Sequence, residues 1–297
     1  TVTLGETLKK IAPVVGSTVR SRAALLFDYE AWWASELDSH PTQQLRYTDE
    51  VLSTYTALWN RGVSTDVVHP SADLSGYDLV VVPTLYLVSD EDAANVAAAA
   101  ERGATVLVTY FSGIVDVNDH VRLGGYPGAF RELLGVSTEE FYTLQEGETV
   151  RLSGGGDALS GTFSADLWTE KTHLVGATAV ATYDEGPLTG LPAVTRADVG
   201  TSGGSAWYVG ARLDTAGIAA VVDAALADAG LTGEADVPAG VEVVRRHAAD
   251  GTSYLFVLNH TGAAVTVKTT GTELTGGVEV DGELTVDAAR VAVVQEG

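Results

Sequence analysis

The stretch Ala23–Phe27, with the sequence AALLF, is a continuous apolar run of the length expected for a buried strand in a parallel sheet. Three further segments carry the same signal: Thr65–Val68, Asp78–Val82 and Thr105–Thr109. Before the last of them, Ser89 supplies an N-cap, and the acidic residues after it supply the first turn of a helix. Strand and helix therefore alternate, which favours βαβ units with right-handed crossovers.

A second helix is predicted between the first two of these strands. Pro41-Thr42 is expected to open it, and a basic last turn followed by Gly62 is expected to end it. Its apolar residues recur at spacings of three and four: Tyr47, Val51, Leu52, Tyr55, Leu58 and Trp59. The fold class is therefore predicted as α/β, a doubly wound, amidotransferase- or flavodoxin-like and mostly parallel sheet.

Later segments extend this prediction. Ala177–Tyr183 and Ala206–Val209 are expected to be further strands of the same sheet, followed by a closing helix over residues 216–229. The stretch Val136–Leu167 has short β-like runs between glycine-rich turns. We interpret it as an irregular β insertion at the edge of the α/β domain.

The pattern becomes all-β after a boundary at Gly230–Ala239. Short alternating strands are predicted at Val241–His247, Ser253–Leu258 and Ala264–Thr269. Asp250-Gly251 and Asp281-Gly282 are hairpin signals. These features predict a small antiparallel β domain, too small to be more than marginally stable alone.

The chain has 297 residues and a formal net charge of −23. A surface this acidic repels nucleic acid and anionic membranes, so neither is expected as a partner. Salt adaptation or a cationic partner would explain the charge, but an acidic surface that keeps a protein in solution is the simpler interpretation.

The composition also limits the chemistry. There is no cysteine, which excludes disulfides, thiolate metal sites and a cysteine nucleophile. No apolar run approaches the roughly 18 residues of a membrane span, and no secretory signal is visible, so a cytoplasmic location is expected. Because the chain starts at Thr1 and contains no methionine, we expect it to be processed or trimmed.

Ligands of doubly wound sheets bind at the carboxyl ends of the strands. Tyr110-Phe111-Ser112-Gly113 lies where amidotransferase-like enzymes carry a nucleophile, but Ser112 lacks the G-x-S-x-G context. The run Asp116–His120 (DVNDH) suggests a metal site, yet it lacks the spacing of calcium or zinc ligands, so a hydrogen-bonded loop is favoured. No hydrolytic triad, metal or cofactor is therefore expected.

Charged and aromatic residues also follow the first strand. Asp28 and Glu30 could be paired carboxylates for glycoside chemistry, but this spacing at a strand end need not bring them together across a sugar. Trp32 and Trp33 could stack on a sugar ring or anchor a protein interface. We favour the interface.

Several of these segments together resemble a known family. Leu25–Trp33 (LLFDYEAWW), Asp73–Leu87, Val108–Pro127 and Pro192–Arg196 resemble the trimerisation domain of glycoside hydrolase family 42 β-galactosidases. The most specific motif is the loop Tyr110–Pro127. In addition, residues 4–17 resemble the linker helix that leaves the catalytic barrel of that family, and residues 240–261 resemble the start of its C-terminal β domain.

The resemblance implies a retaining β-galactosidase whose two catalytic glutamates lie on an N-terminal (β/α)₈ barrel. The acid/base glutamate of such barrels follows an asparagine, and no Asn-Glu pair occurs here, so neither residue can be carried over. The implied domains are a linker helix over residues 1–20, a trimerisation domain over 21–232 and a small β domain over 238–297. Their implied role is to hold three subunits together and to wall the substrate entrance.

The function predicted for this chain is therefore non-catalytic assembly, with a homotrimer and a catalytic barrel as partners and a β-galactoside bound only through that barrel. The alternative is a stand-alone carbohydrate-binding module with aromatic residues at the strand ends. A self-sufficient amidotransferase-like enzyme is disfavoured by the missing nucleophile. Candidate interface or entrance residues are Trp32, Trp33, Tyr110, Phe111, Asp116, Asp119 and His120.

Overall fold

The structure is a computed structural model that describes residues 2–234 and 237–296 and divides into two compact units. The larger unit contains Arg22–Ala57 and Thr65–Leu231. The smaller unit contains residues 1–21, 58–64 and 232–297. The predicted boundary at Gly230–Ala239 includes residues 235–236, which lie outside the described residues, as do the terminal residues 1 and 297 of the predicted domains.

One half of the larger unit is a parallel sheet. Its neighbouring strands, in spatial order, are β3 (Thr65–Val68), β2 (Ala23–Leu26), β4 (Leu79–Val82), β5 (Thr105–Thr109) and β11 (Gly204–Val209). Every residue of the four strands other than β3 is buried, which explains their continuous apolar sequences. The edge strand β3 has instead two exposed residues between two partly buried ones.

Capping residues fix where the helices begin. In α2 (Tyr29–Ser35), the Asp28 side chain accepts a hydrogen bond from the Glu30 amide. Ser89 caps α4 (Asp90–Glu101), as predicted, and Asp214 caps α6 (Thr215–Asp228). The other helices of the larger unit are α3 (Tyr47–Trp59), whose last two residues belong to the smaller unit, and the short α5 (Arg131–Leu134). No helix in the described part of the chain is long and apolar enough to cross a membrane.

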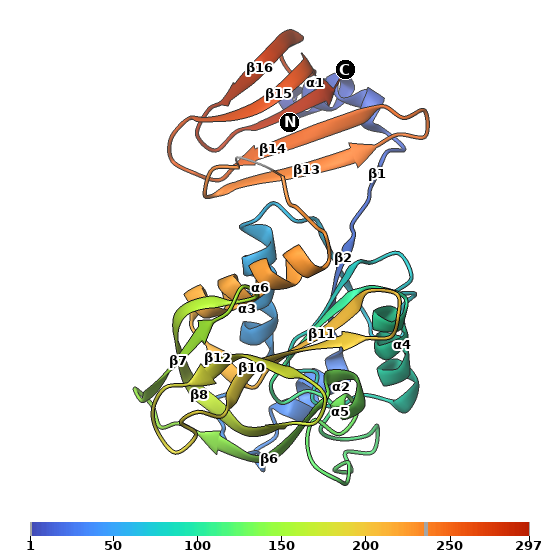
Figure 1. The fold of residues 1–297 in the computed structure, drawn as a ribbon. Helices are drawn as coiled ribbons and strands as arrows, with labels where there is room; N and C mark the ends of the chain where they lie inside the picture. Colours follow the sequence, from blue (N-terminus) through green and yellow to red (C-terminus); the bar gives the residue numbers. More distant parts are fainter. Residues whose placement is uncertain (1, 235–236, 297) are drawn as a thin grey trace. The chain divides into compact units, whose positions relative to one another are not determined.

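The other half of the larger unit is antiparallel (Figure 1). Its strands are β6 (Val136–Thr143), β7 (Thr149–Gly155), β8 (Ser160–Leu174), β9 (Thr178–Tyr183), β10 (Pro192–Val199) and β12 (Ala211–Leu213). The sheet runs β12-β8-β7-β9-β10-β11 and then continues into the parallel half, while β6 pairs with β8. The two halves thus form one mixed sheet of eleven strands.

The predicted doubly wound, flavodoxin-like α/β fold is wrong. The chain is mostly β, with about 39% strand and 21% helix. In the described part of the larger sheet, six strand pairs are antiparallel and four are parallel. The error arose at residues 136–167, which are long paired strands of the sheet and not an irregular insertion. Their half-buried, alternating sequences were too weak a signal between glycine-rich turns.

The predicted start of α3 at Pro41-Thr42 is also wrong, because the helix begins at Tyr47. The Thr42 hydroxyl accepts a hydrogen bond from the Gln44 amide at 3.1 Å, and such a local turn competes with helix formation. Leu45 is buried in the core ahead of the helix. Of the residues predicted on its apolar face, Tyr47 and Leu58 are buried and Val51, Tyr55 and Trp59 are partly buried, but Leu52 is 60% exposed, so the predicted face is only partly correct.

The smaller unit contains an antiparallel sheet of six strands in the order β1-β13-β14-β17-β15-β16. Its strands are β1 (Thr18–Val19), β13 (Val241–His247), β14 (Ser253–Asn259), β15 (Val265–Glu273), β16 (Val278–Val286) and β17 (Val291–Glu296). The unit also contains the helices α1 (Val2–Lys10) and η1 (Ala12–Val14). Since β1 pairs with β13, part of the segment predicted as a linker helix extends this sheet.

The two hairpin predictions had different outcomes. Asp250-Gly251 lies in the turn between β13 and β14, as predicted. Asp281-Gly282 lies inside β16, where Gly282 is opposite Thr269 of β15, so this prediction is wrong. The turn between β15 and β16 falls near Gly276-Gly277, and the Glu273 carboxylate accepts the Gly276 amide there. The dipeptide Asp281-Gly282 alone does not show that the pairing of β16 with β15 continues through it.

Asn259 holds the end of β14 in place and gives a first prediction. Its side chain is buried, and Nδ2 lies 2.8–3.0 Å from the carbonyl oxygens of Ala263, Val286 and Asp287. Asn259→Asp removes this donor and turns a carboxylate toward three acceptors, so we expect a loss of about 3 kcal/mol in the stability of this sheet. Hydrogen exchange of the β13 and β14 amides measures it. The exposed Asn118→Asp is the control, and equal protection in both variants would contradict the prediction.

Candidate functional site

An apolar stripe lies at the carboxyl end of β2, on and just after α2. Tyr29 and Trp33 are one helical turn apart, and Leu37 follows after a further four residues. All three are exposed, and 65% of the Trp33 surface is accessible. Large exposed side chains gathered on one side of an element are typical of an interaction surface.

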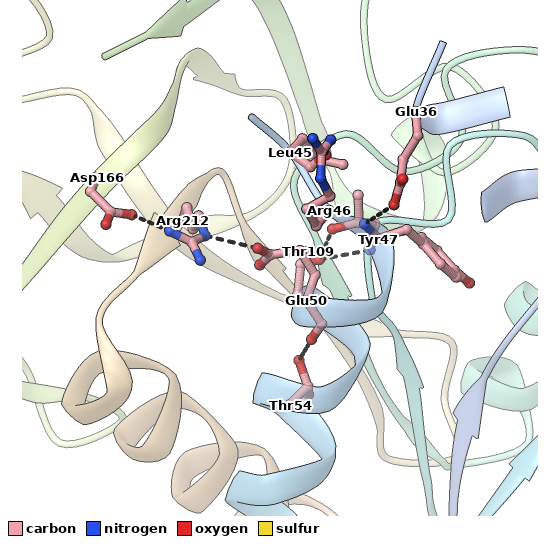
Figure 2. A network of polar contacts seen from close by, with 10 residues as sticks. Glu36, Leu45, Arg46, Tyr47, Glu50, Thr54, Thr109, Asp166 and Arg212 are labelled. Carbon is pink, nitrogen blue, oxygen red and sulfur yellow. Dashed lines mark hydrogen bonds and ion pairs between the residues drawn. The ribbon is translucent and has the colours of Figure 1, made fainter. Parts of the chain in front are cut away.

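Trp32, the neighbour of Trp33, has a different role. Its ring is half-buried and lies 6.1 Å from the ring of Phe27. Its indole nitrogen donates to the Glu36 carboxylate at 2.9 Å, and the same carboxylate accepts the Tyr47 amide at 3.0 Å. Figure 2 shows this link between Glu36 and the start of α3. Trp32 therefore holds α2 against the unit, and Trp33 faces outward.

The turn after β5 is buried. Tyr110 and Phe111 are each 2% exposed, so their side chains lie within the unit. Phe111 has a φ of +57°, an unfavourable value for a residue with a side chain, and its ring lies 4.7 Å from that of Trp168. Phe111 also contacts His40 and Tyr86, at ring distances of 5.3 and 4.7 Å. The turn is thus fixed from several sides.

A charged network supports this turn from the side of α3. Arg212 donates to Glu50 at 2.8 Å and to Asp166 at 2.9 Å, and Figure 2 shows its guanidinium between the two carboxylates. Burial raises the pKa of Glu50, and the charge of Arg212 opposes that rise. Burial, together with the negative charge of Glu50, raises the pKa of Tyr110 far above its usual range. The network therefore joins α3, β8 and β12 beside the base of the loop.

The segment Asp116–His120 forms a closed turn. The Asp116 carboxylate accepts the amides of Asn118 at 2.8 Å and His120 at 3.1 Å, and these bonds lower its pKa. Asp119 and His120 are exposed. Among the described residues, no group of three potential ligands is arranged to hold a metal ion. The Asp116 oxygens thus serve the backbone of their own loop.

The rest of the loop presents apolar side chains on a firmly held backbone. Leu123 is 90% exposed, and Val117 and Val121 are exposed as well. Arg131 of α5 donates to the carbonyl oxygens of Gly124 and Gly125, at 2.5 and 2.7 Å. A rigid loop loses little conformational entropy on binding, so an exposed leucine on it can anchor a partner effectively.

The stripe and the loop both lie at the carboxyl end of the parallel sheet. α2 follows β2, and the loop follows β5, so both lie at carboxyl ends of strands of the same parallel sheet, with β4 between the two strands. His40, in the segment after α2, contacts Tyr86 and Phe111, which connects the two regions directly. We call the exposed apolar residues of both regions the strand-end surface: Tyr29, Trp33, Leu37, Val117, Val121 and Leu123.

Sequence reasoning found only part of this surface. It selected Trp33, and it selected the loop, but it did not single out Leu123 or Arg131. The four-residue spacing of Tyr29 and Trp33 was a usable signal for a shared face. No local pattern marks Leu123 as exposed, because an isolated leucine in a loop is as often buried under it.

Comparisons with known proteins identify the kind of chain this is. The family described as the β-galactosidase trimerisation domain matches residues 21–232, and the family described as the β-galactosidase C-terminal domain matches residues 240–296. The chain belongs to glycoside hydrolase family 42, of which it comprises the trimerisation and C-terminal domains. The two sheets of the described residues include no closed parallel barrel.

The relatives are β-galactosidases of greater length. A β-galactosidase from Arthrobacter sp is 54% identical over 295 residues, which are 99% of this chain and 41% of that protein. BgaA from a Planococcus species is 39% identical, over 91% of this chain and 40% of its own length. The β-galactosidase structure from Bacillus circulans sp. alkalophilus matches with a TM-score of 0.93 at 31% identity, over 99% of this chain and 44% of that one. This chain thus spans about two fifths of the proteins that it matches.

Proposed function

We propose that this chain is the part of a β-galactosidase that joins its subunits, and that the strand-end surface is where two copies meet. The observation that carries the proposal is the set of exposed apolar side chains on α2 and on the loop after β5, both at the carboxyl end of the parallel sheet, with Trp33 and Leu123 as the proposed anchors. Aromatic and large aliphatic anchors on fixed backbone are typical of protein interfaces. The family description as a trimerisation domain supports three copies.

The finer assignment follows from this proposal. The loop residues Asp116, Asp119 and His120 would lie at the rim of a substrate entrance, and Tyr110 and Phe111 would position the loop from within. Retaining hydrolysis of a β-galactoside would take place on a catalytic barrel that is the partner of this chain. We also propose a cytoplasmic location, with residues 1–20 as the linker, 21–232 as the trimerisation domain and 238–297 as the small β domain.

A direct assay tests the non-catalytic part of the proposal. The chain alone is expected to release no product from a chromogenic β-galactoside, because the proposed hydrolysis takes place on the catalytic barrel and not on this chain. A galactose titration followed by tryptophan fluorescence is expected to show no saturation. Hydrolysis by this chain alone would contradict the proposal that catalysis takes place on the barrel. Saturable binding of galactose would favour a carbohydrate-binding module.

A further inference from the structure

Glu170 is a buried carboxylate that the proposed function does not use. It lies in β8 with no accessible surface, directly behind the Phe111 turn. Its Oε1 accepts the indole N–H of Trp168 at 2.9 Å and the amide of Phe111 at 3.4 Å. Its Oε2 accepts the hydroxyls of Tyr208 at 2.5 Å and Thr138 at 3.2 Å. Side chains or backbone from β6, β8, β11 and the turn after β5 thus meet at one carboxyl group.

The hydrogen-bond partners of this carboxyl group are all neutral. The titratable groups that face Glu170 are the phenols of Tyr208 in β11 and Tyr183 in β9, and the hydroxyl of Tyr183 accepts the Glu170 amide at 3.2 Å. From the turn after β5 it meets the backbone amide of Phe111, and from β6 the hydroxyl of Thr138. Burial raises the pKa of Glu170 to about 7, and its hydrogen bonds limit that rise.

The two carboxyl oxygens differ in what they can accommodate. An indole N–H and a backbone N–H can only donate, so Oε1 must remain an acceptor. Hydroxyl groups can rotate and accept instead, so Oε2 can carry a proton. The Thr138 hydroxyl can then accept that proton and donate its own hydrogen to Thr172 Oγ1, 2.9 Å away. The protonated form therefore keeps both bonds at Oε1.

We propose that Glu170 is a proton switch beneath the Phe111 turn. Its carboxyl group is neutral in mildly acidic solution, with the proton on Oε2, and ionised in mildly alkaline solution. The larger unit is less stable when Glu170 is ionised. The inference is independent of the proposed function, since it concerns the folding of the larger unit alone. The stability of the Phe111 turn, at the start of the loop Tyr110–Pro127, therefore depends on pH.

The sign of the effect follows from proton linkage. The pKa of Glu170 is higher in the folded chain, about 7, than the ordinary value of 4.5, so the folded chain binds the extra proton between these values. Its contribution to stability is fully present below about pH 4.5 and is lost as pH rises toward 7. The equilibrium constant for unfolding should rise about tenfold per pH unit in this window and be constant above it.

Glu170→Gln tests this switch, because the amide mimics the protonated form: its oxygen accepts at Oε1, and its NH₂ donates to the two hydroxyls. Urea unfolding is followed by tryptophan fluorescence at pH 5, 6, 7 and 8; Trp32, Trp33, Trp168 and Trp207 report on the larger unit. The ratio of the unfolding constants of wild type and E170Q should grow about tenfold per pH unit from 5 to 7. The exposed Glu132→Gln should follow the wild type. A constant ratio for E170Q would overturn the proposal.

Two further measurements keep the test decisive if E170Q does not fold. Tyr208→Phe removes a donor to the ionised carboxylate, so it should move the pH transition upward. The infrared carbonyl band of a protonated, buried carboxylic acid should appear in the wild type as pH falls from 8 to 6. A transition that Tyr208→Phe leaves in place, or the absence of this band at pH 6, would equally overturn the assignment.

Discussion

Trp33→Asp is expected to dissociate the assembled chain into single copies while leaving each copy folded. Because 65% of the Trp33 surface is accessible, its loss removes no core contact, and a carboxylate at the centre of an apolar interface must be desolvated without a partner. A central aromatic anchor contributes about 2 kcal/mol or more, which corresponds to at least about a 30-fold weaker association. Sedimentation velocity over a concentration series measures the change, with circular dichroism as the check on folding.

The control for this variant is Leu52→Asp. Leu52 is 60% exposed on α3 and lies outside the strand-end surface, so the substitution changes charge and hydrophobicity in a similar way. It should leave the association constant unchanged. If both variants associate like the wild type, the strand-end surface is not where the copies meet.

Arg212→Met is expected to cause a large loss of stability. Removal of the guanidinium leaves the Glu50 side chain, which is only 12% exposed, without the cation that holds it. Removal of one partner of a buried ion pair typically costs 3–5 kcal/mol, and because Arg212 is itself one third exposed we expect about 2–3 kcal/mol. Urea unfolding at pH 8, where Glu50 must stay charged or take up a proton, measures the loss.

Two matched variants separate this network from charge loss in general. Arg151→Met breaks the surface contacts of Arg151, which is 56% exposed, with Asp184 and Glu185 and should cost less than about 1 kcal/mol. The double variant Glu50→Gln with Arg212→Met should recover much of the lost stability, because no buried charge is left. If R212M and R151M lost equal stability, the network in Figure 2 would contribute no more than a surface ion pair.

The sequence predicted the parallel half of the larger sheet well, and the physical reason is simple. Strands β2, β4 and β5 are buried on both faces, so their apolar residues are consecutive and are visible without any tertiary information. Strand β8 is exposed at both ends, alternates between buried and less buried residues over residues 163–166 and is buried over residues 167–170, and it pairs with three other strands. Such pairing depends on distant residues, so the antiparallel half could not be read from local patterns.

The candidate surface was predictable to a similar extent. Trp32 and Trp33 are adjacent and chemically identical, and only the helix geometry separates the anchor that faces inward from the one that faces solvent. Tyr110 and Phe111 are candidate interface residues by sequence, but both are buried, because the turn after β5 packs their rings against Trp168. Glu170 gave no signal at all, since its four donors come from residues as far apart as Phe111 and Tyr208.

The most direct test of the proposed assembly is the mass of the chain in solution. Sedimentation equilibrium between about 1 and about 100 µM covers the range in which a moderate protein interface becomes populated. If the strand-end surface joins three copies, the mass should approach three times 30.9 kDa as concentration rises, and Trp33→Asp should shift this rise to concentrations at least about 30-fold higher. A wild-type mass of 30.9 kDa throughout this range would contradict the proposal that this chain joins subunits.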